Sequence, residues 1–349
     1  MPFRAVSQDQ QQSTSTTVVP EQITIGLLLT DHTQSGVINA AQLAIDRINA
    51  AGGYKNQEFK LLIRTAEGFW GAGSKESVSL VYEDQVRAII GSLDGRNGHL
   101  AEQVASKSHI TYIETYATEP TLSQAFVPWF MRVVPNDNQQ ASTILDQIES
   151  EGGGLIGILS TEDYDTRLAV KSLTKAVARE AGMAPLVIDL DPENIHQYDV
   201  IEKILSSNID HLVIPFDALY LKDLIDALRN ENPDLLIYGT LHFTMSLESR
   251  QDAWGSYEGM FVVAPRFSRE KHASLPDCRS AYMYDAVNLV INAIQQVGMD
   301  RIAITDYISK SEFSKGATGN ISFDKLGNRQ GASTLVRIKN GTPQLILHP

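Results

Sequence analysis

Residues 23–53 of the chain read ITIGLLLTDHTQSGVINAAQLAIDRINAAGG, a short apolar run followed by a stretch with helical periodicity. Apolar residues of the second part recur at positions 37, 40, 41, 44 and 48, which places them on one face of a helix. Gly52 and Gly53 supply a stop, because glycine readily ends a helix in the left-handed conformation. This strand and helix form the first unit of a predicted α/β fold.

Short apolar runs alternate with amphipathic stretches along the rest of the chain, which is typical of βαβ units around parallel sheets. The predicted strands cover residues 23–29, 59–64, 87–91, 111–115, 130–134, 155–159, 186–190, 211–215, 235–239, 260–264 and 334–338. Further helices are predicted around residues 78–82, 98–107, 167–181, 201–205, 219–230 and 281–297. A polar run at 136–140 breaks the composition of the chain, and we expect the chain to cross there from a first group of strands and helices to a second. We therefore expect two Rossmann-like α/β lobes with parallel sheets.

Length, composition and charge limit the possible functions. The chain has 349 residues, which at about 100–200 residues per domain predicts two domains. Its 42 acidic and 29 basic side chains give a net charge of −13, which repels phosphate backbones, so we expect no nucleic-acid partner. The apolar runs are far shorter than the ~20 residues of a membrane-spanning helix. Cys278 is the single cysteine, which excludes an intrachain disulfide and a cysteine-rich zinc site.

Residues 1–20 are rich in Gln, Ser and Thr and show no periodicity, so we expect a flexible leader. The leader lacks the apolar stretch of ~7–15 residues that a signal peptide requires. Polar tracts of this kind commonly tether a folded domain away from a surface. The protein is therefore either cytoplasmic or a mature form restarted at Met1. The second alternative, which the resemblance described below favours, predicts a periplasmic or other extracytoplasmic protein, either free or lipid-anchored.

The sequence lacks the motifs of the common enzyme classes. Residues 68–77 are similar to a phosphate loop, but Ser74 separates Lys75 from the last glycine and Glu76 follows the lysine. No GxGxxG follows a predicted strand, and the sequence contains neither HExxH nor GxSxG. We therefore expect no enzymatic activity, no cofactor and no metal site.

Two loops follow predicted strands of the first lobe, at the sheet edge where open α/β folds bind ligands. The loop around Gly95 precedes a helix whose free amides attract a carboxylate, and Arg96 offers a bidentate clamp. In the second loop Tyr116 offers an aromatic wall and Thr118 a hydroxyl group. The candidate binding residues of the first lobe are Asp94, Gly95, Arg96, Tyr116, Ala117, Thr118 and, after the second strand, Trp70.

The order of these segments resembles the type I periplasmic binding proteins, specifically the Leu/Ile/Val-binding branch that serves ABC transporters. The resemblance covers residue 23 to the end of the chain, and seven segments in the correct order make it specific. They are 23–29, ITIGLLL; 44–53, AIDRINAAGG; 88–92, AIIGS; 116–122, YATEPTL; 130–135, FMRVVP; 284–287, YDAV; and 319–328, GNISFDKLGN.

This resemblance implies two lobes joined by three hinge crossings, near Pro135, near Ala264 and near residues 328–331. The N-terminal lobe would comprise residues 21–135 and 265–328, and the C-terminal lobe residues 136–264 and 329–349. The helix at 281–297 would then return to the first lobe, and the last strand would belong to the second.

The resemblance also implies site residues in the second lobe. In the family an aromatic residue after the first strand of this lobe contacts the ligand, and Tyr164 stands at that place. Asp217 follows a later strand at another usual contact position, where it can pair with an ammonium group. The acidic residue that binds the ligand's ammonium in the family falls near Leu241 or His242, neither of which is acidic. With His242 at this place, either Asp217 substitutes for the missing acidic residue or the ligand lacks an amine. The family's amino acid binders also place a serine or threonine near Gly95 and a small residue near Tyr116, so the resemblance does not imply an ordinary leucine site.

The implied function is that of an extracytoplasmic receptor. It would capture an amino-acid-like, carboxylate or amide solute between two closing lobes and deliver it, as a monomer, to the permease of an ABC importer. A cytoplasmic ligand sensor of the same fold, similar to the amide-sensing regulators, is the main alternative. An enzyme on an α/β scaffold is a third, and would need catalytic residues that the sequence does not show.

Overall fold

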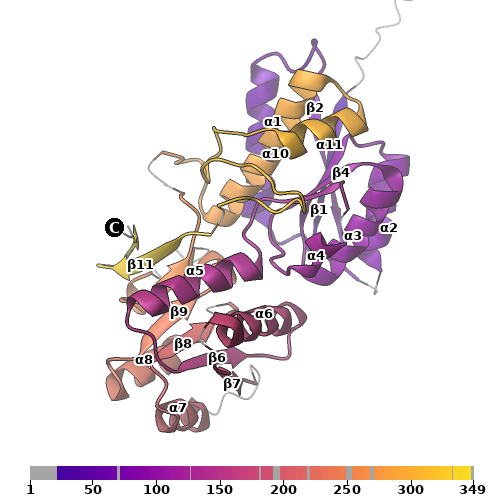
Figure 1. The fold of residues 1–349 in the computed structure, drawn as a ribbon. Helices are drawn as coiled ribbons and strands as arrows, with labels where there is room; N and C mark the ends of the chain where they lie inside the picture. The colour runs from indigo at the N-terminus through magenta and orange to yellow at the C-terminus, as the bar shows by residue number, and fades with distance from the viewer. Residues whose placement is uncertain are drawn as a thin grey trace, which may run out of the picture.

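The computed structural model describes residues 22–346, apart from 69–70, 126, 181, 192–196, 218–220, 249–253, 268–270 and 332. The predicted leader, residues 1–20, and the candidate Trp70 therefore lie outside the described residues. Two α/β lobes, each built on its own sheet, make up this part of the chain (Figure 1).

The first lobe has a five-stranded parallel sheet with the order β2-β1-β3-β4-β5. Alternate residues of its strands point to opposite faces, so Leu27 packs with α1 and α10 while Leu28 packs with α3. Burial on both faces explains the nearly continuous apolar runs of the strands at residues 23–29 and 88–92, whereas the edge strand at 59–65 is only partly buried. The strands are β1 (Ile23–Leu29), β2 (Phe59–Thr65), β3 (Ala88–Ser92), β4 (Thr111–Glu114) and β5 (Phe130–Arg132). The helices are α1 (Ser35–Ala50), α2 (Ala72–Val78), α3 (Gly95–Ser108), α4 (Thr121–Gln124), α10 (Cys278–Val297) and α11 (Arg301–Lys310).

The second lobe has a seven-stranded sheet with the order β12-β11-β10-β9-β8-β6-β7. Ile158 packs with α5 and α6 on one face, and Leu159 packs with α7, α8 and α9 on the other. The strands are β6 (Ile156–Ser160), β7 (Leu186–Asp189), β8 (His211–Ile214), β9 (Leu236–Gly239), β10 (Phe261–Val263), β11 (Leu335–Lys339) and β12 (Thr342–Leu345). The helices are α5 (Asp137–Ser150), α6 (Tyr164–Glu180), α7 (Gln197–Ser206), α8 (Lys222–Glu231) and α9 (Leu241–Glu248).

The second sheet differs from the fully parallel one that the sequence predicts. Strand β11 pairs antiparallel with β10 and continues into a hairpin with β12. Asn340 and Gly341 form the two-residue turn with φ values of 53° and 67°, as in the tight hairpin turns that favour Asn-Gly. Strand β12 was not predicted, because all four of its residues are exposed and show no apolar alternation.

The polar run at 136–140 is the first turn of a helix rather than only a break between lobes. Asn136 accepts a hydrogen bond from the Gln139 amide, and the Gln139 side chain accepts one from the Asn136 amide, which forms a capping box for α5. Polar residues are favoured at this place because they satisfy the free amides of a helix start. The sequence analysis likewise missed α9 and α11.

The chain passes between the lobes three times, as the alternation of sheets shows (Figure 1). It leaves the first sheet after β5, returns after β10 to place α10 against α1, and enters the second sheet again at β11. Arg329, 3% exposed, ties two of these connections together by donating hydrogen bonds to the carbonyl oxygens of Val133 and Thr318. The exact lobe limits given above stay a prediction.

Candidate functional site

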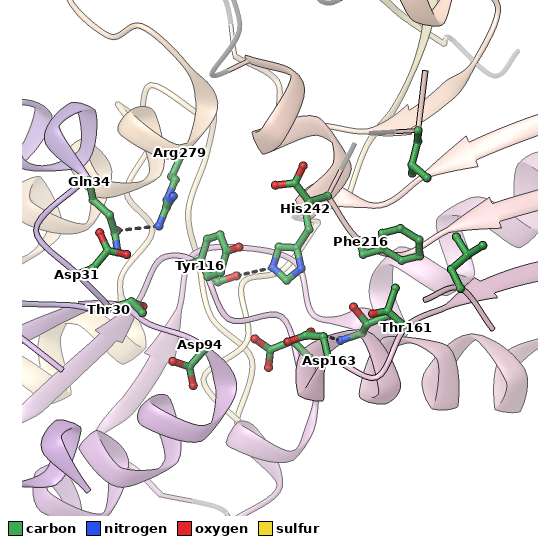
Figure 2. Close-up of a pocket in the computed structure, with 15 residues that line it drawn as sticks. Thr30, Asp31, Gln34, Asp94, Tyr116, Thr161, Asp163, Phe216, His242 and Arg279 are labelled. Carbon is green, nitrogen blue, oxygen red and sulfur yellow. Dashed lines mark hydrogen bonds between the residues drawn. The ribbon is translucent and has the colours of Figure 1, made fainter. Parts of the chain in front are cut away.

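A cleft of about 500 Å³ lies between the two lobes, at the carboxyl ends of their parallel strands (Figure 2). Both sheets bring loops to this place because parallel strands all end at the same edge. The lining residues from the first lobe are Thr30, Asp31, Gln34, Asp94, Tyr116 and Arg279. Those from the second lobe are Thr161, Asp163, Asp165, Thr166, Leu190, Phe216, Asp217, Leu221 and His242.

Three stacked side chains form one wall of the cleft (Figure 2). The guanidinium of Arg279 lies 4.5 Å from the centre of the Tyr116 ring. On its other side Tyr116 stacks on His242, with ring centres 4.7 Å apart and planes 21° apart. Arg279 and Tyr116 come from the first lobe and His242 from the second, so the stack joins the two lobes.

His242 is neutral in this stack, because burial lowers its pKa below the ordinary value. Its Nε2 lies 3.2 Å from the carbonyl oxygen of Tyr116, which assigns the ring proton to this nitrogen as donor. The residue therefore contributes a ring face and a hydrogen bond between the lobes, and no charge.

Arg279 lies in the first turn of α10 and reaches the cleft from that helix start. Asp277 caps the helix by accepting a hydrogen bond from the Ser280 amide. The guanidinium donates to Gln34 Oε1 at 2.7 Å and to Ser92 Oγ at 3.3 Å. Its charge also contributes to the lowered pKa of Asp31, whose largest cause is the hydrogen bond from the Thr33 hydroxyl.

A buried carboxyl group holds the loop that carries Tyr116. Glu114, 0% exposed, accepts hydrogen bonds from the backbone amides of Thr115, Tyr116 and Ala117 at 2.9, 2.8 and 3.2 Å. The Tyr112 hydroxyl donates to its other oxygen. Burial raises the pKa of Glu114 even though these donors lower it. The side chain thereby fixes the backbone below the stacked wall.

The helix start predicted to attract a ligand carboxylate is already in contact with a carboxyl group of the chain itself. The Gly95 amide donates to Asp165 Oδ1 at 3.1 Å and to Oδ2 at 3.3 Å. Asp165 lies in the first turn of α6, so this contact also joins the lobes. Burial raises the pKa of Asp165 to about 7, although the Gly95 amide opposes the shift.

The structure brings four of the predicted site residues into the cleft: Asp94, Tyr116, Asp217 and His242. Arg96 instead packs its guanidinium 4.7 Å from the centre of the Tyr164 ring, and both line an adjoining cavity with Asp94. Thr118 is buried at 4% exposure beside α5, where its carbonyl oxygen accepts from the Asp137 amide. Ala117 is fully buried among apolar residues of the first lobe. Five predicted site residues therefore lie outside the lining of the cleft: Gly95, Arg96, Ala117, Thr118 and Tyr164.

Several lining residues were missed by the sequence analysis. Asp31, Asp163, Asp165 and Phe216 each follow a strand that was predicted, so their position after a strand was an available signal. Arg279 had no such signal, because it enters the cleft from a helix that was expected to begin at residue 281. Among the described residues, no group of histidine, cysteine, aspartate and glutamate is arranged to hold a metal ion. The cleft offers charge recognition, hydrogen bonds and apolar contact.

Comparison with known proteins identifies relatives for most of the chain. The family model of the receptor family ligand binding region matches residues 37–340. The chain is 23% identical over 272 residues to glutamate receptor 3.7 of Arabidopsis thaliana, which covers 64% of this chain and 29% of that protein. It is 29% identical over 101 residues to glutamate receptor 3.1 of Oryza sativa subsp. japonica, and this match covers 29% of this chain and 11% of that protein. The chain thus spans less than a third of the length of these curated relatives.

Solved structures share the fold over nearly the whole chain. The branched-chain amino acid transporter substrate binding protein of Streptococcus pneumoniae, in complex with isoleucine, is 20% identical with a TM-score of 0.76, covering 93% of this chain and 99% of that one. A solute binding protein of an ABC transporter from R. palustris, in complex with benzoate, is 16% identical with a TM-score of 0.77. The match covers 93% of this chain and 96% of that one. The expected two-lobed fold is confirmed.

Proposed function

This chain belongs to the protein family whose model describes the ligand-binding region of the receptor family. We propose that it is an extracytoplasmic solute-binding receptor of an ABC importer. It captures a small molecule between its lobes and delivers it to a membrane permease. The observation that carries the proposal is the cleft itself, which takes its lining from the strand ends of both lobes.

In this proposal the contacts between the lobes belong to the closed state of the receptor. Asp165 meets the Gly95 amide, His242 meets Tyr116, and both pairs join residues of different lobes. Three connections between the lobes restrict their relative motion to a hinge, which is the usual mode of closure around a ligand. A ligand that touches both walls stabilises the closed state in proportion to its preference for that state.

The permease partner is supported by the names of the structural neighbours, several of which are ABC transporter substrate-binding proteins. They do not favour the alternative of a cytoplasmic sensor. Of the helices that the structure describes, none has the length and hydropathy required to cross a membrane. In this proposal the chain acts as a monomer outside the cytoplasm and depends on the permease for transport.

The proposal is tested by thermal unfolding of the purified chain with amino acids, amides, amines, small carboxylates and aromatic acids. A ligand at 100 times its Kd stabilises the folded state by about 2.7 kcal/mol, which raises Tm by several degrees. Phe216→Ala, in the cleft wall, should abolish the shift. Tyr82→Ala, which truncates a ring that is 61% exposed outside the cleft lining, should preserve it. The receptor proposal is wrong if no compound of any class raises Tm.

A further inference from the structure

The lining of the cleft carries a strong excess of negative charge. Among the described residues that line it, five carboxyl groups face one guanidinium, that of Arg279, which gives these residues a formal excess of four negative charges. His242 adds no positive charge, because burial lowers its pKa. Even with Asp165 protonated, four carboxylates remain against one cation. The carboxyl groups are those of Asp31, Asp94, Asp163, Asp165 and Asp217.

These carboxyl groups line the cleft from both lobes, and Figure 2 labels three of them, Asp31, Asp94 and Asp163. Asp31 and Asp94 follow β1 and β3 in the first lobe, and the other three follow β6 and β8 in the second. Several are held in place by local hydrogen bonds: Asp94 accepts from the Asn97 amide at 3.0 Å, and Asp163 from the Thr166 amide at 2.9 Å. An anion in the cleft would be repelled from both walls, whereas a cation would be attracted by both.

The place where a ligand carboxylate would meet a helix start is surrounded by internal carboxyl groups. The Gly95 amide donates to Asp165, and Asp94 caps the same helix. Glu119 lies beside them: a Cβ atom at Gly95 would be 2.6 Å from Asp165 Oδ1 and 2.9 Å from the carboxyl carbon of Glu119. Glu119 is itself paired with the imidazole of His99, whose pKa the hydrogen bonds with Glu102 and Glu119 raise to about 9. A ligand carboxylate would therefore have to displace Asp165 and approach Asp94.

The guanidinium of Arg279, the one cation among the described lining residues, already contacts several neighbours. Arg279 lies over the Tyr116 ring and donates to Gln34 and Ser92. Its charge also acts on Asp31. On the opposite side, apolar side chains of the second lobe complete the cleft, and Phe216 provides a half-buried ring that suits a cation or an apolar group. The apolar members are Leu190, Phe216 and Leu221.

From this arrangement we propose that the cleft selects an organic cation, a primary amine or guanidine joined to an apolar group, over a carboxylate. The inference rests on the proposed receptor function and names the ligand class of the same cleft. The family and the cleft define the site, and the carboxyl groups decide only the charge that it accepts. The cation bridges acidic groups of the two lobes and thereby stabilises the closed state.

Calorimetric titration with five probes tests this proposal: agmatine, benzylammonium, benzamide, benzoate and leucine. Benzylammonium, benzamide and benzoate have similar shapes and differ in charge, so their comparison isolates the electrostatic contribution. We expect one of the two cations to bind at least tenfold more tightly than benzoate and leucine. Its affinity should fall as salt is raised, because salt screens exposed charges.

Two matched substitutions test whether the preference for a cation arises from the carboxyl groups of the cleft. Asp163→Asn should weaken cation binding roughly 10- to 100-fold, the range of one charge-assisted hydrogen bond. Asp306→Asn removes a carboxylate of α11 that pairs with Lys310 outside the cleft lining, and should leave the affinity unchanged. Equal losses in both variants would overturn the assignment of the charge to the cleft.

The outcomes separate this inference from the receptor function. Tighter binding of benzoate or leucine than of either cation would overturn the inference and support the receptor function. Tighter binding of benzamide than of either cation, with no dependence on salt, would also overturn the inference and support the receptor function. Binding of none of the five probes, together with no Tm shift in the wider screen, would overturn both.

Discussion

The carboxyl group of Asp165 accepts hydrogen bonds from the backbone amide of Gly95 at 3.1 and 3.3 Å, and this contact joins the first turns of α6 and α3 across the two lobes. Burial raises the pKa of Asp165 from 3.8 to about 7. A contact between the lobes therefore contains a group that exchanges its proton near neutral pH.

The first prediction concerns the pH dependence of stability. Because the folded state binds the Asp165 proton more tightly than the unfolded state, this group stabilises the fold fully below about pH 4, and its contribution is lost as pH rises through about 7. Asp165→Asn keeps an acceptor for the Gly95 amide and removes the titration. Between about pH 5 and pH 8, Tm of the variant should therefore fall less than Tm of the natural chain, by several degrees, because the shifted pKa corresponds to roughly 2–3 kcal/mol over this range.

Unfolding scans at several pH values check this prediction. Asp306→Asn is the control, because Asp306 is exposed and lies in the first lobe away from the contact. Parallel Tm curves for Asp165→Asn and the natural chain would show that the Asp165 proton does not contribute.

The sequence was informative about the sheets and less so about the helix starts. Strands such as β1 and β8 are fully or nearly fully buried, so their apolar runs are continuous and their ends are easy to locate. Helix starts such as that of α5 depend on capping contacts between polar side chains, which have no hydrophobic period. The exposed strand β12 has neither signal.

In the site, too, some residues could be predicted from the sequence pattern and others depend on contacts that the pattern does not reveal. Asp94 and Tyr116 were predicted because they follow buried strands at the sheet edge where ligands bind. The direction of a side chain cannot be inferred in this way: Arg96 lies one residue from the helix start and turns to Tyr164 rather than to the cleft. Arg279 reaches the cleft from more than 160 residues beyond Tyr116, through packing that only the folded chain shows.

A second prediction concerns the buried carboxyl group below Tyr116. Glu114→Ala leaves the backbone amides of Leu93, Tyr116 and Ala117 without their acceptor, so it should reduce the free energy of unfolding by roughly 2–4 kcal/mol. Glu114→Gln keeps an acceptor at this place, so it should reduce the free energy of unfolding by less. Urea unfolding measures both, with Glu149→Ala on the exposed face of α5 as control. A loss for Glu114→Ala no larger than that of the control would show that the loop does not depend on this group.

A third prediction separates the binding role of the stacked wall from its stability. Arg279→Lys should weaken binding of the ligand found in the screen roughly two- to fivefold, because lysine cannot keep the planar contact with Tyr116 and the fork of hydrogen bonds. Arg47 makes a similar contact, 5.3 Å from the Tyr284 ring centre, outside the cleft lining. Arg47→Lys should therefore change Tm without changing affinity. Equal affinities for the natural chain and Arg279→Lys would contradict the role of this wall.

The last prediction returns to Gly95 and tests the closed state directly. An alanine Cβ at this position would lie 2.6 Å from Asp165 Oδ1, a distance that forces the two lobes or the side chains apart. Gly95→Ala should therefore favour an open arrangement, which small-angle X-ray scattering measures as a larger radius of gyration, and should weaken ligand binding. Gly255→Ala is the control, because no atom lies within 4 Å of its added Cβ. If Gly95→Ala keeps both the natural radius of gyration and the natural affinity, Asp165 moves aside freely and its contact with Gly95 does not hold the lobes together.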